Sequence, residues 1–318
     1  MIMTPLDIII VNYNSGSYLK KCLGSLFKYP ENLNYIDNII IINNGSTDDS
    51  LKIESPPKYN IKVIKNEYNI GFAAACNQGA KLSNARYLLF LNPDTQLFAE
   101  SIEKPLSFLE SPENRDVAIL GVQLVDQHNQ ILRTCARFPT LKTFLMKSLG
   151  LSKIFHRFDH FMFEWDHKET RFVDQVIGAF FLIRRKTFEE LGGFDERFFV
   201  YFEELDLSLR AAQNGWKSIY YVEAQALHEG AGSSRNIKAR RLFYFLRSQI
   251  FYGYKHLGCL QGTILLFSTV SLEFMARIAF AFIKGSWQET RDTWGAYLML
   301  LKDYKNIFQT IKSFRGKK

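Results

Sequence analysis

The chain has 318 residues, of which 47% are hydrophobic and 15% aromatic, enough for one large domain or for a domain with a substantial extension. Its net charge of +8 is unevenly divided: residues 1–234 hold 25 Lys and Arg against 28 Asp and Glu, whereas residues 235–318 hold 15 against 4. The acidic balance of the larger part argues against a protein coated by nucleic acid, and the break predicts two regions that divide at 234/235.

Short apolar runs alternate with segments of helical spacing through the first region. The runs predict strands at Leu6–Val11, Ile39–Ile42, Ile61–Ile64, Tyr87–Leu91 and Val117–Val122. The segments between them predict helices at Tyr18–Phe27, Thr47 to about Ile53, Phe72–Leu82 and Phe98–Leu109. Strands that are apolar at every position and are separated by helices indicate an α/β fold with a mostly parallel sheet covered on both faces.

Polar and turn-forming residues follow the first four predicted strands, in "NYNSG", "NNGSTDDS", "KNEYNIGFAAACNQG" and "NPDT". Ligands of such sheets bind beyond the carboxyl ends of the strands, so four loops of this kind favour a binding site over loops that are merely solvated. Neither a "GxGxxG" dinucleotide motif nor a P-loop is present. Side-chain amides and hydroxyls suit a nucleobase and a ribose, and Asp94 suits a divalent cation that also binds a diphosphate.

An acidic pair, Glu203 and Glu204, opens a predicted helix that runs to about Gln213. Carboxylates at a helix start can serve only to complement the helix dipole, or one of them can act as a base kept ionised by the helix terminus. The strand "KSIYYV" and the loop "HEGAGSS" follow. His228 at the start of that loop is either a structural histidine or a metal ligand.

Taken in order, these motifs resemble a known family. "IIIVNYNSGSYLKKCLGSL", "IINNGSTDDS", "NIGFAAACNQGA", "LFLNPDT", "VIGAFFLIRR", "GGFDERFFVYFEELDLSLRAAQNGW" and "HEGAGSS" are similar to successive motifs of the inverting nucleotide-sugar glycosyltransferases of family 2, which have the GT-A fold. More narrowly, they resemble the rhamnosyltransferase-like branch that builds bacterial surface polysaccharides. The resemblance covers roughly Leu6 to His256.

The resemblance implies a role for each matching residue. Side chains and turns from the loops would border the nucleotide of the donor: Tyr13, Asn14, Asn43, Asn44, Asn69, Gly71, Asn77 and Asn92. Gly178 and Ala179 would form a small-residue turn beside the sugar. Asp94 and His228 would hold Mg²⁺ or Mn²⁺ against the diphosphate, with no separate cofactor.

Glu204 would be the catalytic base, with Glu203 as the fallback. The base would take the proton of an acceptor hydroxyl while its oxygen displaces the diphosphate with inversion. Two residues depart from the usual family pattern. Asn43 replaces an aspartate, which leaves the identity of the base open, and Glu204 replaces an aspartate, which shifts the carboxylate by about 1 Å.

The resemblance implies a sugar transferase, with rhamnose as the candidate sugar, that acts on a saccharide acceptor in surface polysaccharide biosynthesis. The expected acceptor is a lipid-linked saccharide. One alternative is an enzyme that transfers a sugar to polyprenyl phosphate itself, which would be expected to show clear membrane spans. Another is a non-catalytic module that binds nucleotide sugars. The Phe- and Trp-rich stretch between Arg133 and Arg171 could form an acceptor platform or a lid, or equally a satellite core.

The basic region 235–318 predicts amphipathic helices on an anionic membrane surface, a helical subdomain packed on the core, or a dimer interface. Its longest uncharged run, Leu257–Leu272, has 16 residues, short of the roughly 20 that span a bilayer. Four scattered cysteines and an N-terminus without a basic n-region favour a reducing compartment. We therefore expect a cytoplasmic protein that is peripheral on the cytoplasmic face of the membrane.

Overall fold

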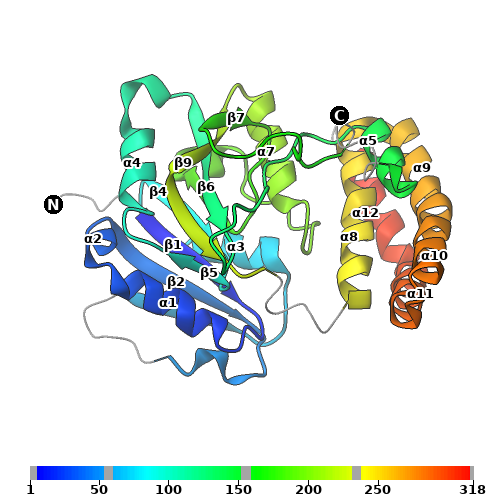
Figure 1. The fold of residues 1–318 in the computed structure, drawn as a ribbon, viewed down its shortest axis with the longest axis horizontal. Helices are drawn as coiled ribbons and strands as arrows, with labels where there is room; N and C mark the ends of the chain where they lie inside the picture. Colours follow the sequence, from blue (N-terminus) through cyan, green and yellow to red (C-terminus); the bar gives the residue numbers. More distant parts are fainter. Residues whose placement is uncertain (1–5, 54–59, 152–158, 231–237, 316–318) are drawn as a thin grey trace. The chain divides into compact units, whose positions relative to one another are not determined.

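The computed structural model describes residues 6–53, 60–151, 159–230 and 238–315, and Figure 1 shows their fold. The chain forms two compact units. The α/β unit comprises residues 1–137, 165–196 and 203–233, and the helical unit comprises residues 138–164, 197–202 and 234–318. The division predicted at 234/235 lies outside the described residues.

The α/β unit is built on a nine-stranded sheet in the order β3-β2-β1-β4-β8-β6-β9-β5, with β7 paired to β9. The strands are β1 (Leu6–Asn12), β2 (Ile36–Asn44), β3 (Ile61–Asn66), β4 (Tyr87–Leu91), β5 (Thr95–Leu97), β6 (Val117–Val125), β7 (Arg171–Val173), β8 (Phe180–Arg184) and β9 (Lys217–His228). β1 to β4 are parallel, β6 is parallel to β9, and the short β5, β7 and β8 run antiparallel to their neighbours. This mostly parallel sheet flanked by helices confirms the predicted fold class.

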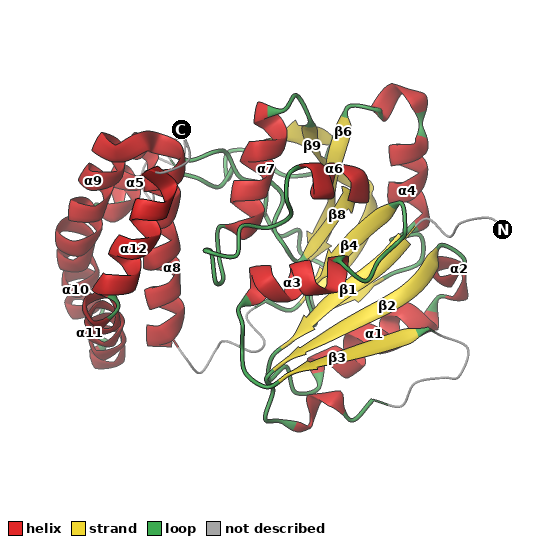
Figure 2. Cartoon of the chain, turned by 180° about the vertical axis from the view of Figure 1, so that it is seen from behind, coloured by secondary structure: helices red, strands yellow, loops and turns green. Residues whose placement is uncertain are grey.

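Helices cover both faces of this sheet, and its central strands are therefore buried at every position. The described helical segments are α1 (Tyr18–Lys28), α2 (Pro30–Leu33), η1 (Asp49–Leu51), α3 (Phe72–Ala80), α4 (Glu103–Glu110), η2 (Pro112–Asn114), α6 (Arg185–Glu190) and α7 (Glu203–Gln213). Ile8 and Ile10 of β1 belong to the same core cluster as the apolar faces of α1 and α4. Ile9 contacts α3, whose Gly79 has no room for a side chain against it. Figure 2 shows α3 in front of the strands and α1 behind them.

Two predicted helices differ from the structure. The helix expected at Phe98–Leu109 begins only at Glu103, because residues 95–97 pair with β9 as a strand and Glu100 has a left-handed backbone with φ +64°. The helix expected from Thr47 to about Ile53 is a single 3₁₀ turn at Asp49–Leu51. Hydrogen bonds to the first loop hold this segment instead of a continuous helix.

The helical unit contains α5 (Leu141–Ser148), α8 (Lys238–Tyr252), η5 (Gly253–Leu257), α9 (Gly258–Ser268), η6 (Thr269–Glu273), α10 (Phe274–Ile283), α11 (Trp287–Lys302) and α12 (Tyr304–Arg315), where η5 and η6 are π-helical turns. Buried polar groups join these helices. Gln249 of α8 donates hydrogen bonds to Thr269 and Glu273 at 3.1 Å each, and the Tyr297 hydroxyl of α11 donates to the carbonyl of Thr269 at 2.8 Å. The π-helical turn η6 is thus fixed to both α8 and α11.

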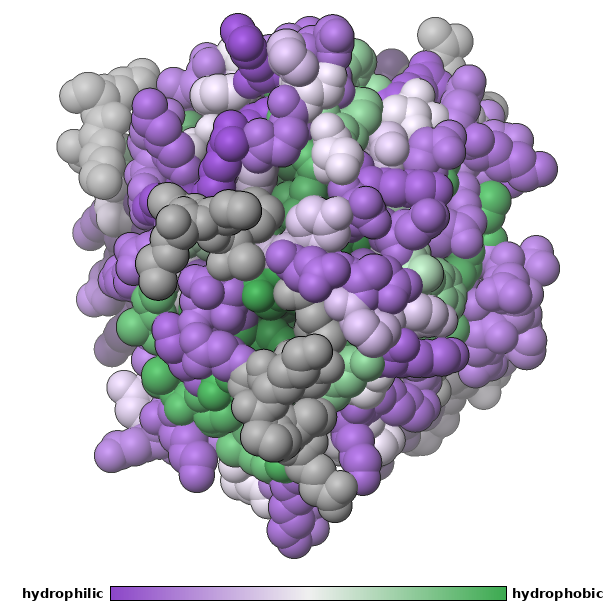
Figure 3. All heavy atoms as spheres, turned by 90° about the vertical axis from the view of Figure 1, so that its left-hand side faces the viewer, coloured by the Kyte–Doolittle hydropathy of each residue, from purple (hydrophilic) through white to green (hydrophobic). Residues whose placement is uncertain are grey.

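The two units have different surfaces. Figure 3 shows a face of the molecule on which hydrophilic side chains predominate over small hydrophobic patches. In the helical unit, by contrast, large apolar side chains on α9 and α10 are exposed, among them Leu260, Phe267, Met275, Phe282 and Ile283. Between Gly258 and Ile283, charged residues are confined to the buried Glu273 and its half-buried partner Arg277. This helical stretch therefore presents an apolar face to the solvent.

Candidate functional site

A network of side-chain amides joins the first two loops at the carboxyl edge of the sheet. The buried Asn12, the last residue of β1, donates to Asn43 Oδ1 at 3.1 Å, to Ser46 Oγ at 3.2 Å and to Ser50 Oγ at 2.8 Å. Asn14 has a left-handed backbone with φ +47°, and its Oδ1 accepts from the backbone N–H of Thr47 at 2.8 Å. The first loop is therefore locked to the second before any ligand binds.

Asn44 joins the second loop to the third in the same way. Its Nδ2 donates to Asn69 Oδ1 at 3.0 Å and to the Gly71 carbonyl at 3.1 Å. Its Oδ1 accepts from Asn66 Nδ2 at 3.2 Å and from the Ile70 N–H at 3.0 Å. Because this amide is fully used and buried, we assign Asn44 the role of holding the third loop, rather than direct contact with a nucleotide.

Other predicted nucleotide residues keep free groups. The Oδ1 of Asn43 accepts from Asn12, while its Nδ2 donates no hydrogen bond to any described residue. The half-buried Tyr13 follows β1, and within the described chain its hydroxyl has no hydrogen-bond partner. A ring and an amino group are therefore available at this edge for a nucleobase and its acceptor oxygens.

Sequence reasoning did not find Asn12 and Asn66. Both are the last residues of their strands, as is Asn44 of β2. An asparagine at the end of three neighbouring parallel strands is a readable signal, because such residues meet at one edge of a sheet. The hydrogen bonds between them nevertheless depend on side-chain orientation, which spacing does not give.

Gly45 is required where the second and third loops meet. Its φ is +75°, and an added Cβ would lie 2.6–2.8 Å from backbone atoms of Tyr68 and Asn69. We expect Gly45→Ala to displace the third loop and to lower both donor affinity and stability. Gly16→Ala is the control, because Gly16 also has a left-handed backbone (φ +56°) but has open space around its Cβ position. Gly16→Ala should lower the free energy of unfolding by only about 1–2 kcal/mol, through backbone strain.

Chemical denaturation and titration with a nucleotide-sugar donor would measure both effects. If the two variants lost equal stability and Gly45→Ala bound donor like the wild type, the packing of Gly45 against the third loop would be unimportant.

Asp94 and His228 come together where β5 pairs with β9. The register sets Thr95 opposite His228, and the Asp94 backbone carbonyl accepts from the Glu229 N–H at 3.1 Å. Asp94 Oδ1 lies 3.4 Å from His228 Nδ1, and the two side chains are only 11% and 13% exposed, respectively. Two residues 134 positions apart in the chain thus face each other, as a shared ligand would require.

The chemistry of this pair fits a divalent cation. A carboxylate and an imidazole are ligands compatible with Mg²⁺ and better suited to Mn²⁺. No group of three or more His, Cys, Asp or Glu side chains that could hold a metal occurs among the described residues. A cation here would therefore take further ligands from outside this pair, such as diphosphate oxygens and water.

The acidic pair lies at the start of α7. The backbone N–H groups of Glu204, Gly178 and Leu205 act on the carboxylate of Glu204 and lower its pKa, against the effect of burial. One oxygen, Oε2, is shielded from solvent and has no hydrogen-bond partner in the described parts of the chain. A Cβ added at Gly178 would have no neighbour within 4 Å, so there is open space next to this residue.

Gly178 and Ala179 link this acid to the metal pair. The Gly178 N–H favours the ionised form of Glu204, and the carbonyl of the next residue, Ala179, accepts from the Asn92 N–H at 3.1 Å and from Thr95 Oγ1 at 3.2 Å. Asp94 lies between these two partners in the chain. A single dipeptide therefore acts on the carboxylate of Glu204 and contacts the turn that carries Asp94.

Burial raises the pKa of both acids above the ordinary value of 4.5. The pKa of Glu203 is raised well above 4.5, chiefly by burial, and the neighbouring charge of Glu204 raises it further. For Glu204, the N–H groups of Gly178 and Leu205 act in the opposite direction and favour the ionised form. Glu203 is therefore the more easily protonated member of the pair, and Glu204 the more easily ionised one.

Glu203 is expected to reduce stability at neutral pH. A raised folded-state pKa contributes stability that is present below pH 4.5 and is lost as pH rises through the folded-state pKa. The pH window of this effect runs from 4.5 up to the folded-state pKa of Glu203. Glu203→Gln, which cannot ionise, should therefore be more stable than the wild type above this window and equally stable below it. Within the window, the difference grows by up to about 1.4 kcal/mol per pH unit. Urea denaturation at several pH values measures this, and a difference that stayed constant with pH would contradict the assignment.

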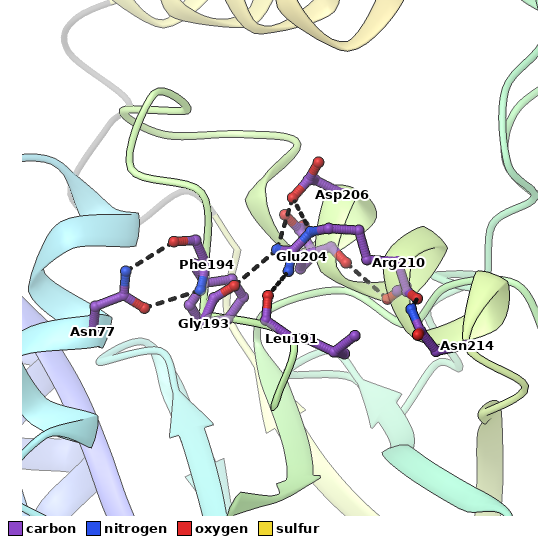
Figure 4. Close-up of polar contacts among 9 residues, drawn as sticks. Asn77, Leu191, Gly193, Phe194, Glu204, Asp206, Arg210 and Asn214 are labelled. Atoms are coloured by element: carbon purple, nitrogen blue, oxygen red, sulfur yellow. Dashed lines mark hydrogen bonds and ion pairs between the residues drawn. The ribbon is translucent and has the colours of Figure 1, made fainter. Parts of the chain in front are cut away.

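Figure 4 shows the frame that supports the acids. Arg210 of α7 pairs with the buried Asp206 at 2.8 Å and donates to the carbonyls of Leu191 and Gly193 at 2.5 and 2.8 Å. Asn77 of α3 binds the next residue, Phe194, through both its N–H and its carbonyl. These contacts hold the loop that contains Gly193 between α3 and α7. Asn77, predicted at the nucleotide, thus uses its amide within the protein.

The predicted site residues thus form three connected groups in the α/β unit. The loop asparagines form the first, the pair Asp94 and His228 forms the second, and Glu203 and Glu204 form the third. Gly178 and Ala179 join the second group to the third. The loop that follows His228 continues into residues 231–237, which lie outside the described chain.

Comparisons with known proteins give the family and the fold. The family model described as glycosyl transferase family 2 matches residues 7–192. The N-acetylglucosaminyl-diphospho-decaprenol L-rhamnosyltransferase of Mycobacterium tuberculosis is 27% identical over 269 residues, which cover 80% of this chain and 85% of that protein. Rhamnosyltransferase WbbL of Escherichia coli is 26% identical over 260 residues, covering 77% and 91% of the two chains.

Solved structures are similar in fold. S. aureus TarS in complex with UDP-GlcNAc has a TM-score of 0.56 and 16% identity, and the match covers 96% of this chain and 81% of that one. A mannosyltransferase from Pyrobaculum calidifontis in complex with GDP-Man and Mn²⁺ has a TM-score of 0.55 and 13% identity, with 98% and 86% covered. At these identities the similarity shows the fold alone.

Proposed function

Because this chain belongs to glycosyl transferase family 2, we propose that it is an inverting enzyme that transfers a sugar from a nucleotide diphosphate to a lipid-linked saccharide. Rhamnose is the sugar that we propose, since both relatives compared above are rhamnosyltransferases. The acceptor proposal rests on the mycobacterial relative, whose name gives a diphospho-decaprenol acceptor. Synthesis of a surface polysaccharide is the process in which such a transfer would serve.

The link from the Asp94 turn through Gly178 and Ala179 to Glu204 is the observation that carries this proposal. It relates Asp94, which suits the diphosphate side of the reaction, to Glu204, which suits the acceptor side. The amide network would bind the nucleotide through Tyr13 and the free Nδ2 of Asn43. All these residues lie in the α/β unit.

Glu204 is the better candidate for the base. Its side chain is half-buried, open space lies beside Gly178, and the N–H groups of Gly178 and Leu205 favour its ionised form. Glu203 is only 4% exposed and is the more easily protonated acid. Glu204 would take the proton of the acceptor hydroxyl as its oxygen attacks the anomeric carbon opposite the diphosphate, which inverts that carbon.

Asp94 and His228 would hold Mg²⁺ or Mn²⁺, which when bound supplies positive charge that stabilises the departing diphosphate. Asp94 lies on a turn fixed by Ala179 and β9, and His228 ends β9, so contacts within the protein hold the backbone that carries each side chain.

A donor panel tests the function directly. Purified protein is given dTDP-, UDP- and GDP-sugars, with Mn²⁺, with Mg²⁺ or with EDTA, together with a polyprenyl-diphosphate saccharide. We expect transfer from one class of donor, loss of transfer in EDTA, and a product whose anomeric configuration, read by NMR, is opposite to that of the donor. Donor binding without transfer to any acceptor would favour a non-catalytic module, and a product that retains configuration would contradict Glu204 as a base for direct displacement.

The helical unit supplies a surface for membrane attachment. Residues 235–318 carry a net charge of +11, and this same region exposes the large apolar side chains of α9 and α10. A groove of about 390 Å³ with an almost wholly apolar lining, including Trp294, Leu298 and Phe308, continues this character onto α11 and α12. Basic charge combined with exposed apolar and aromatic side chains suits the headgroup region of an anionic bilayer.

One helical stretch, Lys238–Ile283, is long and apolar enough to cross a membrane by length and composition, and 28% of its most apolar window is buried. The uncharged run Leu257–Leu272, with 16 residues, is shorter than this helical stretch. Two features favour attachment to the surface instead. Gly258, with φ +85°, interrupts the helical backbone, and Thr269 and Glu273 bind Gln249 of α8.

Replacing Phe282 and Ile283 by serine should weaken attachment. These side chains are 62% and 81% exposed, and burial of each in a bilayer contributes about 1.5–3 kcal/mol. Sedimentation with anionic vesicles should show at least a tenfold loss of binding. Val63→Ser, at an exposed apolar residue of β3, is the control and should bind like the wild type. Alkaline carbonate should release the wild-type protein from membranes, whereas a spanning helix would resist extraction.

A further inference from the structure

We propose that a cationic pocket in the helical unit binds the diphosphate of the lipid-linked acceptor. The pocket is formed by Lys147, Lys238, Arg241 and Arg277. The inference deepens the proposed function and rests on it, because that function supplies the lipid-linked acceptor.

The pocket has a volume of about 330 Å³ and lies where α5, α8 and α10 of the helical unit meet residue 201. Its four cations come from three different helices, and Tyr201, Leu242 and Phe245 complete the lining. No carboxylate is among the lining residues. A pocket of this size is at the lower end of the range that holds small ligands, and its charge suits a compact anion.

Most of this charge is not neutralised within the described chain. Arg277 is paired with Glu273, at 2.6 Å from Nη2 to Oε1. Lys147, Lys238 and Arg241 form no ion pair with any described carboxylate. Three cations that converge without a partner repel one another, so an anion bound between them is stabilised. A diphosphate, with negatively charged oxygens on both phosphate groups, matches this arrangement better than a single carboxylate does.

Lys147 is the cation most affected by its surroundings. Its ammonium lies 4.5 Å from the centre of the Phe245 ring, and burial lowers its pKa. Arg277 lowers that pKa further, while Glu273 and Asp159 act in the opposite direction. A bound anion would restore the charged form, so Lys147 gains more from a phosphate than a solvated surface lysine does.

Tyr201 connects the pocket to the proposed chemistry through the chain itself. It precedes Glu204 by three residues, and three residues span at most about 11 Å. The covalent chain therefore keeps the backbone of Tyr201 within this distance of the residue proposed as the base.

The backbone around Tyr201 is unusual. Tyr201 and Phe202 have φ values of +68° and +72°, in the left-handed region that non-glycine residues seldom adopt. Phe202 is held there by ring contacts with Phe245 and Tyr252, at centroid distances of 5.3 and 5.7 Å. Strain of this kind persists where the surrounding structure enforces it, and it often accompanies function. Here it directs Tyr201 to the cationic pocket.

Binding of a soluble acceptor analogue tests the proposal. The probe is N-acetylglucosaminyl diphosphate that carries a short prenyl chain, titrated into the full-length protein by calorimetry without metal or donor. The same sugar on the same chain without the diphosphate is the comparison ligand. We expect Lys147→Met and Arg241→Met each to weaken binding of the probe roughly 10- to 100-fold, as loss of a charged hydrogen bond implies. The wild type should bind the comparison ligand at least tenfold more weakly than the probe.

Lys312→Met is the matched control, because Lys312 is an exposed lysine of α12 in the same unit. It should leave probe binding unchanged while removing the same charge. Circular dichroism and thermal unfolding establish that each variant is folded, and Arg241→Lys should recover part of the affinity. Binding of the variants to anionic vesicles distinguishes the source of the phosphate. Loss of vesicle binding with unchanged probe binding would show a headgroup contact and would overturn the proposal.

Equal binding of the probe and the comparison ligand, or no binding of either, would also overturn it. Donor titration in the presence of Mn²⁺ keeps this failure apart from failure of the proposed function. If the wild type binds a nucleotide sugar but the pocket variants bind the probe normally, only the pocket assignment is wrong. If no nucleotide sugar binds, the proposed function itself is wrong.

Discussion

Glu204→Gln is expected to abolish sugar transfer while leaving donor binding intact. Glutamine has the length and shape of glutamate and keeps one oxygen for the backbone N–H groups of Gly178 and Leu205, so the side chain should stay where it is. It cannot take a proton from the acceptor, however, and loss of a positioned base lowers kcat by roughly 10²- to 10⁴-fold. Steady-state kinetics with a saturating donor, together with donor titration, measures the two effects separately.

Glu203→Gln is the matched control for this substitution, since it removes the neighbouring carboxyl and should retain transfer. If Glu203→Gln lost activity and Glu204→Gln kept it, the roles of the two acids would be reversed. The pH profile gives an independent reading. Because burial raises the pKa of Glu204, kcat should fall with decreasing pH around a midpoint above 4.5, where the base becomes protonated. This acidic limb should be absent from the residual activity of Glu204→Gln.

Asp94→Ala is expected to remove the metal dependence of donor binding. The substitution leaves His228 as the remaining predicted ligand, and a bound cation contributes several kcal/mol to stabilising charge on a leaving phosphate. We therefore expect at least about a 10³-fold loss in kcat/KM. Donor titrations with and without Mn²⁺ should give the same weak affinity for the variant and different affinities for the wild type.

Asp116→Ala is the control for Asp94→Ala. Asp116 pairs with Lys217 where β6 and β9 begin, at the opposite edge of the sheet from the site. Its removal should leave the response to Mn²⁺ unchanged. An Asp94→Ala enzyme that still required Mn²⁺ for donor binding would show that the cation binds elsewhere.

Much of the fold could be predicted because its strongest signals are local. β4 has the predicted bounds Tyr87–Leu91, since a fully apolar run meets a proline turn, and α7 extends to Gln213 as expected from its acidic start and its Asn-Gly stop. β5 and β8 were not predicted. β5 has only three residues, and the sequence of β8 is as apolar as that of a parallel strand although it runs antiparallel to β4.

The identities of the site residues could be predicted from the order of the motifs, but their contacts could not. Nothing in the spacing of Gly178 shows that its N–H acts on Glu204, because this effect depends on how β8 enters the sheet. Likewise, the motif that places Asn77 beside the nucleotide does not show that its amide binds the backbone of Phe194. Segments 138–164 and 197–202 belong to the helical unit, which no local pattern indicated.

The amide network has a consequence for how pH acts on this enzyme. Asn12, Asn43, Asn44 and Asn69 hold the nucleotide loops together, and none of them gains or loses a proton under physiological conditions. Uncharged hydrogen bonds are also little affected by ionic strength. The proposed nucleobase end of the site should therefore keep its shape in salt and at any pH at which Asp48, which accepts from the Gly16 N–H and from Ser50, stays ionised. A change of rate with pH would then report on the acids and the cation site, so that recognition of the nucleoside and activation of the acceptor can be adjusted independently of each other.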